Sequence, residues 1–211
     1  HGFRVARSKL QPINIIRRLM DYHAAVGTKL LVTLIDGGKA FEQAIFRKAG
    51  EKQMEDLMSG VAFLKKLSYV DQANMGLFGW KYGGFMTINF MLNHPGVFKA
   101  AVAGGPVTDW KFYEIMYTER YMDRPQENPE GYDLNSPLNY AEQLKGKLLL
   151  VHGSADDNVH FQNTMRMVEA LVQANKQFDW ALYPDKNHGI YGGKTREQLY
   201  TKMTHFILNN L

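Results

Sequence analysis

Short apolar runs alternate along the chain with longer segments in which apolar residues recur every three or four positions. The runs predict strands buried on both faces, and the segments with helical spacing predict the helices between them. Predicted strands lie near 30–35, 75–79, 98–103, 148–152 and 178–183, and predicted helices at 13–25, 51–67, 85–91, 161–174 and 195–211. This order indicates an α/β fold with a mostly parallel sheet and helices on both faces.

Two of the predicted helices carry finer predictions. In the helix at 161–174, the residues predicted to face the core are Phe161, Met165, Val168 and Val172. The helix near the C-terminus is predicted to open with a capping box, since Thr195 and Gln198 have its spacing. Between the predicted strands at 98–103 and 148–152, residues 107–147 are rich in Tyr, Pro and Asn. This excursion is too long for an ordinary loop, so we expect small helices that form a lid over a site.

Composition sets limits on the class of protein. The 211 residues favour one domain, 1–211, and hold no apolar run of membrane-spanning length. The absence of Cys excludes disulfides, thiolate metal sites and a cysteine nucleophile. Much of the net charge of +4 comes from basic residues at positions 4–18, which lie before the first acidic residue of the chain. No aromatics interleave with them, so we interpret them as a solvated end and expect no nucleic-acid partner.

The strongest local motif is Gly79-Trp80-Lys81-Tyr82-Gly83, which lies between a predicted strand and a predicted helix. Glycines on both sides of one central residue are typical of the nucleophile elbow, G-x-S-x-G, in which a sharp turn exposes the central side chain above a sheet. Lysine here occupies the position of the serine. A desolvated lysine could form a Schiff base, but a nearby carboxylate favours the ammonium, which has no lone pair with which to attack.

Polar residues follow two later strands. Asp156 lies after the strand at 148–152, and His188 lies after the strand at 178–183. An elbow residue, then an acid, then a histidine is the chain order of α/β-hydrolase triads, in which histidine activates the nucleophile and the carboxylate fixes its tautomer. The nearby His152, Asp157 and His160 could instead suggest a metal site, but side chains that alternate after a strand end diverge, so we expect neither metal nor cofactor.

Several segments together resemble the prolyl oligopeptidase family, specifically the bacterial type of its dipeptidyl peptidase IV branch. They are Gly79-Trp-Lys-Tyr-Gly-Gly-Phe-Met-Thr, Pro106-Val-Thr-Asp-Trp, Tyr117-Thr-Glu-Arg-Tyr, His152-Gly-Ser-Ala-Asp-Asp-Asn-Val-His-Phe-Gln and Tyr183-Pro-Asp-Lys-Asn-His-Gly-Ile. The resemblance extends from about 36 to 211, and residues 1–35 match weakly. It implies the α/β-hydrolase fold and serine-type cleavage of peptides after Pro or Ala.

The resemblance also assigns roles to residues. The catalytic positions are those of Lys81, Asp156 and His188, and Asn158 is expected to hold a substrate carbonyl. The pocket for proline is expected to consist of Tyr82, Val107, Trp110, Tyr113, Tyr117 and Val159. The backbone amide of Tyr82 would bind the oxyanion. The resemblance further implies an N-terminal propeller domain and a periplasmic or extracellular location.

This sequence departs from the family pattern in ways that affect the expected activity. Besides Lys81, it lacks the upstream Tyr-x-Gly-Pro stretch that supplies a second oxyanion donor, the N-terminal strands and the propeller, and its Asp36-Gly37-Gly38 replaces a longer loop. We expect Lys81 to pair with Asp156 and the chain to be inactive. We also expect self-association through the strand at 30–35, left near a sheet edge. The alternative is a non-catalytic pseudoenzyme or a module that binds peptides or proteins.

Overall fold

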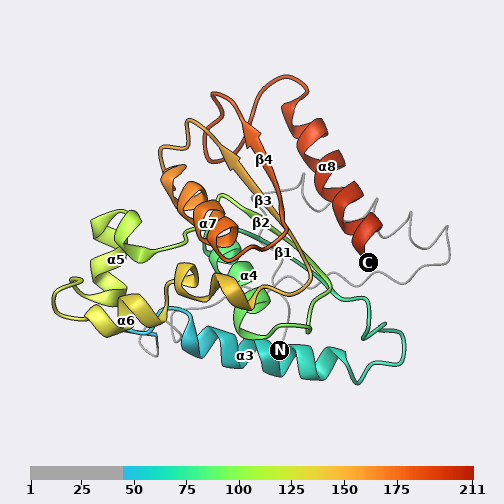
Figure 1. Cartoon of the computed structure of the whole chain (residues 1–211), viewed down its shortest axis with the longest axis horizontal. Helices are drawn as coiled ribbons and strands as arrows, with labels where there is room; N and C mark the ends of the chain where they lie inside the picture. Colours follow the sequence, from blue (N-terminus) through green and yellow to red (C-terminus); the bar gives the residue numbers. More distant parts are fainter. Residues whose placement is uncertain (1–44) are drawn as a thin grey trace, which may run out of the picture.

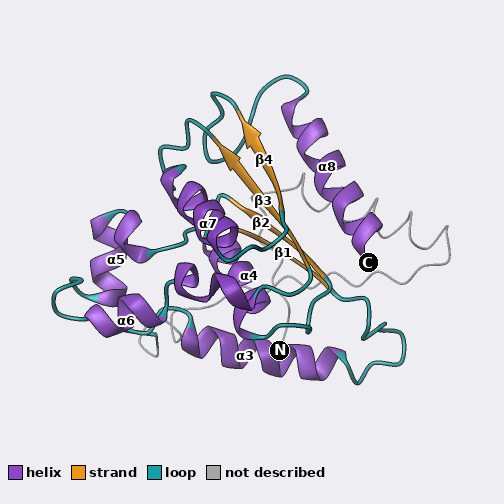
Figure 2. Ribbon diagram, viewed as in Figure 1, coloured by secondary structure: helices purple, strands orange, loops and turns teal. Residues whose placement is uncertain are grey.

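The computed structural model describes residues 45–211, in which four parallel strands form one sheet in the order β1-β2-β3-β4 (Figure 2). The strands are β1 (Gly76–Trp80), β2 (Ala100–Gly104), β3 (Lys147–Gly153) and β4 (Asp179–Tyr183). Each lies within two residues of its predicted position, and the predicted α/β class is confirmed. The predicted helix at 13–25, the strand at 30–35 with its expected self-association, the turn at 36–38 and the basic end lie outside the described residues.

The sheet separates two apolar cores, because successive side chains of a strand point to opposite faces. One face of β2 and β3 carries Ala101, Ala103, Leu148 and Leu150, which pack in one core with α3 (Glu51–Leu64), α4 (Tyr82–Asn93) and α7 (Gln162–Gln173). The other face carries Ala100, Val102, Leu149 and Val151, which pack with α8 (Thr195–Asn210). Figure 1 shows α8 on one side of the sheet and α4 and α7 on the other.

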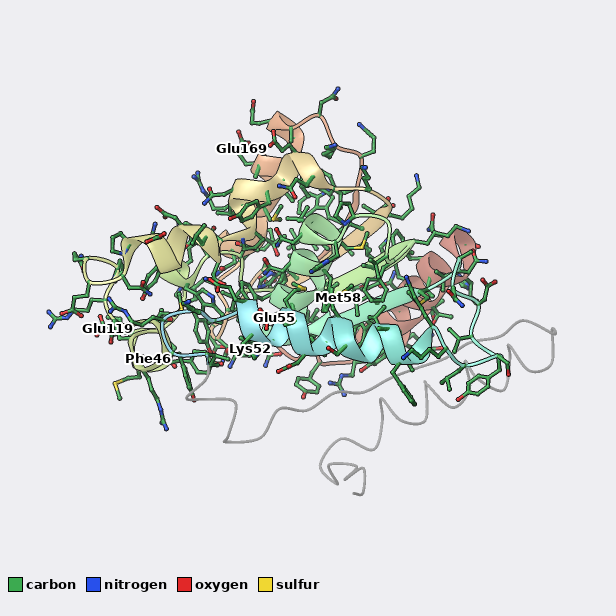
Figure 3. The ribbon with its side chains drawn as sticks, turned by 90° about the horizontal axis from the view of Figure 1, so that it is seen from below. Phe46, Lys52, Glu55, Met58, Glu119 and Glu169 are labelled. Atoms are coloured by element: carbon green, nitrogen blue, oxygen red, sulfur yellow. The ribbon has the colours of Figure 1, made fainter. Side chains whose placement is uncertain are left out.

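Helix α3 lies against the core through one apolar face. Met54 and Val61 are buried, whereas Lys52 and Glu55 project into solvent as a surface ion pair (Figure 3). Exposed pairs of this kind contribute little to stability, so the apolar face holds the helix in place. The helix ends at Leu64 rather than at the predicted Leu67, and tighter turns continue the chain from there.

The predicted inward face of α7 is wrong in part: Val168 does pack against the core, and Phe161 precedes the helix as its N-cap. Met165 and Val172 are exposed, and the buried residues of this helix are Asn163, Thr164, Met167 and Leu171. The Asn163 carboxamide oxygen accepts the Thr108 backbone N–H at 2.9 Å, and the Thr164 hydroxyl lies 2.7 Å from His152 Nδ1. Buried polar groups are stable when their hydrogen bonds are satisfied, and those partners lie far away in sequence.

The predicted capping box of α8 is also wrong. Thr195 is the first helical residue, and the N-cap is Lys194, which makes no side-chain capping bond. Gln198 instead accepts a hydrogen bond from the Tyr183 hydroxyl at 2.6 Å. This bond links α8 to the end of β4, so the glutamine serves tertiary packing rather than the helix terminus.

The segment 107–147 holds the short helices η1 (Trp110–Phe112), α5 (Ile115–Met122), α6 (Pro129–Leu134) and η2 (Pro137–Gln143). Helices α5 and α6 lie on the side of the molecule away from α8 (Figure 1). Buried polar contacts anchor the start of the segment, where Ser136 donates to the Asp109 carboxylate at 3.0 Å. None of the helices in the described range is long and apolar enough to cross a membrane.

Candidate active site

Lys81 occupies a sharp turn between β1 and α4. Its φ of 57° and ψ of −111° place a lysine in backbone space that non-glycine residues seldom adopt. Its N–H donates to the carbonyl of Gly104, and its carbonyl accepts the N–H of Phe85, both at 2.9 Å. The turn is therefore held on both sides, at the carboxyl end of β1, where open α/β sheets place their sites.

The two glycines that flank Lys81 have different packing. A Cβ on Gly79 would lie 2.0 Å from the carbonyl oxygen of Gly83, so no side chain fits there without moving backbone. A Cβ on Gly83, in the first turn of α4, would have no atom within 4 Å. The close approach at Gly79 is thus what gives the turn its sharpness.

We expect Gly79→Ala to lower the free energy of unfolding by about 1–3 kcal/mol, because overpacking forces the backbone to shift. Gly83→Ala is the matched control, and it should raise the free energy of unfolding by up to about 1 kcal/mol, since alanine favours helix. Urea denaturation followed by circular dichroism measures both. Equal stabilities of the two variants would contradict the close packing of the turn.

Asp156 and His188 form the central polar contact of the site. His188 Nδ1 lies 2.6 Å from Asp156 Oδ2, and the other carboxylate oxygen accepts the backbone N–H groups of Asn158 and Val159 at 3.0 and 2.9 Å. Burial of Asp156 would raise its pKa, but the hydrogen bonds from His152 and His188 outweigh burial and hold the pKa well below its usual range. Asp156 is therefore a carboxylate at neutral pH.

His152 is a third member of this network, which the sequence brought forward only as a possible metal ligand. Its Nε2 lies 2.8 Å from the carbonyl oxygen of Val159 and 3.1 Å from Asp156 Oδ2. A carbonyl can only accept, so Nε2 carries the proton, and Nδ1 accepts the Thr164 hydroxyl. No group of three His, Asp or Glu side chains within 45–211 is placed to hold a metal ion.

The imidazole of His188 lies beside the elbow. Trp80 Nε1 donates to the backbone carbonyl of His188 at 3.1 Å, and the two rings meet edge to face at 6.3 Å. A Cβ on Gly105 would lie 2.8 Å from His188 Cε1, and the preceding Gly104 accepts the Lys81 N–H. The residue before Lys81 and the loop that binds it thus both contact His188.

An aromatic wall, consisting of Tyr82, Trp110, Tyr113 and Tyr117, also lies beside Lys81. The Trp110 ring stacks on Tyr117 with centroids 5.9 Å apart, and it lies 5.8 Å from Tyr82 and 6.2 Å from Tyr113. The predicted pocket residues Val107 and Val159 are both buried. Burial, and secondarily the nearby Tyr117, raises the pKa of Tyr82 well above its usual range, so its phenol stays neutral.

A residue of the aromatic wall also orients the side chain of Asn158. The Tyr113 hydroxyl donates to its side-chain oxygen at 3.2 Å, while its backbone N–H donates to Asp156. Among residues 45–211 no acceptor binds the side-chain amide N–H groups of Asn158, which can donate to another group.

The expected pairing of Lys81 with Asp156 is wrong. The Lys81 ammonium lies over the rings of Tyr113 and Tyr117, with Nζ 5.1 and 5.7 Å from their centroids. It forms no ion pair with any acid of the described part of the chain. Asp156 already accepts hydrogen bonds from both histidines and from the backbone, so its oxygens are occupied.

A hollow of about 760 Å³ lies elsewhere, between α8 and the edge of the sheet. Its lining includes Leu149, Asp179 and Lys202 but none of the residues of the elbow, the His188–Asp156 pair or the aromatic wall. It therefore adds nothing to the chemistry of the site.

Comparison with known proteins decides the family. Residues 35–211 match the sequence model of the prolyl oligopeptidase family. The chain belongs to this family. It is 49% identical to the dipeptidyl peptidase 4 of Porphyromonas gingivalis, whose crystal structure superposes with a TM-score of 0.78 over 80% of this chain and 24% of that one.

Animal members of the prolyl oligopeptidase family are similar as well. The chain is 36% identical over 187 residues to the prolyl endopeptidase FAP of Mus musculus, covering 84% of this chain and 25% of that protein. It is 37% identical over the same length to the dipeptidyl peptidase 4 of Felis catus, covering 84% and 24%. The chain thus spans about a quarter of the length of these relatives. The family resemblance read from the motifs is confirmed, and with it membership of a family of serine peptidases.

Proposed function

We propose that this chain is part of the catalytic domain of a dipeptidyl peptidase-type enzyme, with Lys81 at the nucleophile position, and that it does not cleave peptides as written. The observation that carries the proposal is the elbow geometry of Lys81 beside the His188–Asp156 pair. A lysine ammonium has no lone pair, so a peptide carbonyl held there meets no nucleophile.

The rest of the site suits acyl transfer. Because Asp156 is a carboxylate and can only accept, His188 Nδ1 carries a proton and its Nε2 lone pair is left to take one from residue 81. The Tyr82 N–H belongs to the first turn of α4, where amides have no partner within the helix. We assign this N–H to the oxyanion that forms during cleavage.

We assign recognition of a proline or alanine side chain to the aromatic wall with Val107 and Val159. Asn158, oriented by Tyr113, would donate to a substrate carbonyl. A peptide is therefore the proposed ligand, no cofactor is invoked, and segment 107–147 acts as the lid. Self-association or a propeller domain would complete the binding surface. By analogy with the family, we place the protein in the periplasm or outside the cell.

A second candidate is a module that binds peptides or proteins without cutting them. Lys81 favours this candidate, because it removes the nucleophile while the walls of the pocket stay buried and well packed. The two candidates differ in whether the remaining site can activate a serine.

Labelling with a fluorophosphonate, which reacts with activated serines, tests the proposal. The unchanged chain should not be labelled, and Lys81→Ser should be, because trapping needs only one attack. The control variant carries both Lys81→Ser and His188→Ala, and it should lose the label. A folded Lys81→Ser protein that resists labelling would overturn the catalytic proposal and leave the binding module.

A further inference from the structure

Within the described residues, aromatic rings rather than an acid hold the ammonium of Lys81. Its Nζ lies 5.1 Å from the ring centroid of Tyr113 and 5.7 Å from that of Tyr117. Both distances lie within the range over which a cation is attracted to a ring face. We call Trp110, Tyr113 and Tyr117 the aromatic cage.

The three rings of the cage pack against one another. Tyr117 stacks on Trp110 at an interplanar angle of 20°, and Tyr113 stands nearly perpendicular to Tyr117 at 82°, with centroids 5.4 Å apart. Trp110 is 1% exposed and Tyr113 is 9% exposed. Ring faces carry negative partial charge, and they attract a cation more strongly where water is excluded. Two such faces converge on one point, which Lys81 Nζ occupies.

We propose that the aromatic cage is a cation-binding site, that Lys81 fills it from within the chain, and that a free primary alkylammonium enters when this side chain is shortened. The inference rests on the proposed function in one respect, since the cage belongs to the proposed peptide pocket. Lys81 would then affect that pocket in two ways. It supplies no nucleophile, and its side chain occupies the pocket.

The attachment of Lys81 to the elbow explains why a free ammonium does not compete in the unchanged chain. Hydrogen bonds to Gly104 and from Phe85 fix its backbone on both sides. A tethered group is present at an effective concentration of about millimolar or more, so a weak free ligand cannot displace it at lower concentration.

The test replaces the missing atoms with a small molecule. Lys81→Ala keeps Cβ and removes the atoms that correspond to n-propylammonium. This cation is titrated at constant ionic strength into the unchanged chain, Lys81→Ala and Lys111→Ala, while the ring resonances of Tyr113 and Tyr117 are followed by NMR. Lys111 is the matched control, because it is an exposed lysine that pairs with Asp133 at 2.8 Å.

We expect Lys81→Ala to bind n-propylammonium at least about tenfold more tightly than the unchanged chain or Lys111→Ala. Neutral n-propanol should bind Lys81→Ala about threefold more weakly than the ammonium or worse. Equal binding by all three proteins, or equal binding of alcohol and ammonium, would overturn the proposal. Lys81→Ser serves as the second variant if the alanine protein does not fold.

The two proposals fail separately. Fluorophosphonate labelling of Lys81→Ser without ammonium binding would overturn only the cation site. Ammonium binding by Lys81→Ser without labelling would overturn only the catalytic proposal and keep the cage.

Discussion

The unchanged chain is expected to release no chromophore from a Gly-Pro anilide above the buffer rate. Loss of a triad nucleophile costs on the order of a million-fold in turnover. Lys81 cannot replace the hydroxyl, because its ammonium lies in the aromatic cage, over Tyr113 and Tyr117. A serine-bearing dipeptidyl peptidase 4, assayed at the same concentration, provides the positive control.

Lys81→Ser should recover only a small part of that turnover. The 211 residues contain no upstream Tyr-x-Gly-Pro stretch to supply the second oxyanion donor, and one missing donor costs about a hundred- to a thousand-fold. Robust hydrolysis by the unchanged chain, abolished by His188→Ala, would show that the lysine-bearing elbow is catalytic and would contradict the proposal.

The parts of the fold that could be predicted from sequence depend on local pattern. Apolar runs located β1 to β4 within two residues. Strands β2 and β3 are buried on both faces and leave a continuous apolar signal, whereas the outer strands β1 and β4 have exposed apolar residues in the described part of the chain, Phe78, Trp180 and Leu182. The elbow could be located because Gly79 and Gly83 surround one residue at a strand-to-helix junction. Asp156 and His188 could be paired because carboxyl ends of parallel strands meet at one edge of the sheet.

The parts that were missed depend on partners distant in sequence. The buried face of α7 is set by Asn163 and Thr164, whose hydrogen bonds reach Thr108 and His152. No periodicity of apolar residues reports such bonds. The position of the Lys81 ammonium was missed because charge favoured Asp156, whereas the structure has already filled both oxygens of that carboxylate.

Asp156 is the most heavily bonded acid of the site. Two imidazoles and two backbone amides donate to it, and its side chain is 1% exposed. Its removal would leave several buried donors without a partner. Hydrogen bonds to charged groups are worth about 1.5–3 kcal/mol each, and breaking a buried charged pair costs about 3–5 kcal/mol.

We therefore expect Asp156→Asn to lower the free energy of unfolding by about 3 kcal/mol or more at pH 7. The pKa of Asp156 is lower in the folded chain than the ordinary value of about 3.9 in the unfolded chain. Its contribution to stability is thus complete above about pH 4 and is lost as pH falls from there toward the folded-state pKa. The gap between the unchanged chain and Asp156→Asn should narrow over that window.

Urea denaturation at a series of pH values measures this gap. Asp157→Asn is the matched control, because Asp157 is the exposed neighbour of Asp156 and changing it should leave stability within about 0.5 kcal/mol. A gap for Asp156→Asn that stays constant from neutral pH down to about pH 3 would mean that the carboxylate is not held in its charged form by the two histidines. An ordinary pKa would still leave Asp156 a carboxylate at neutral pH, so this outcome would refute the stabilisation of its charge by the histidines while leaving the proposed role of His188 as base intact.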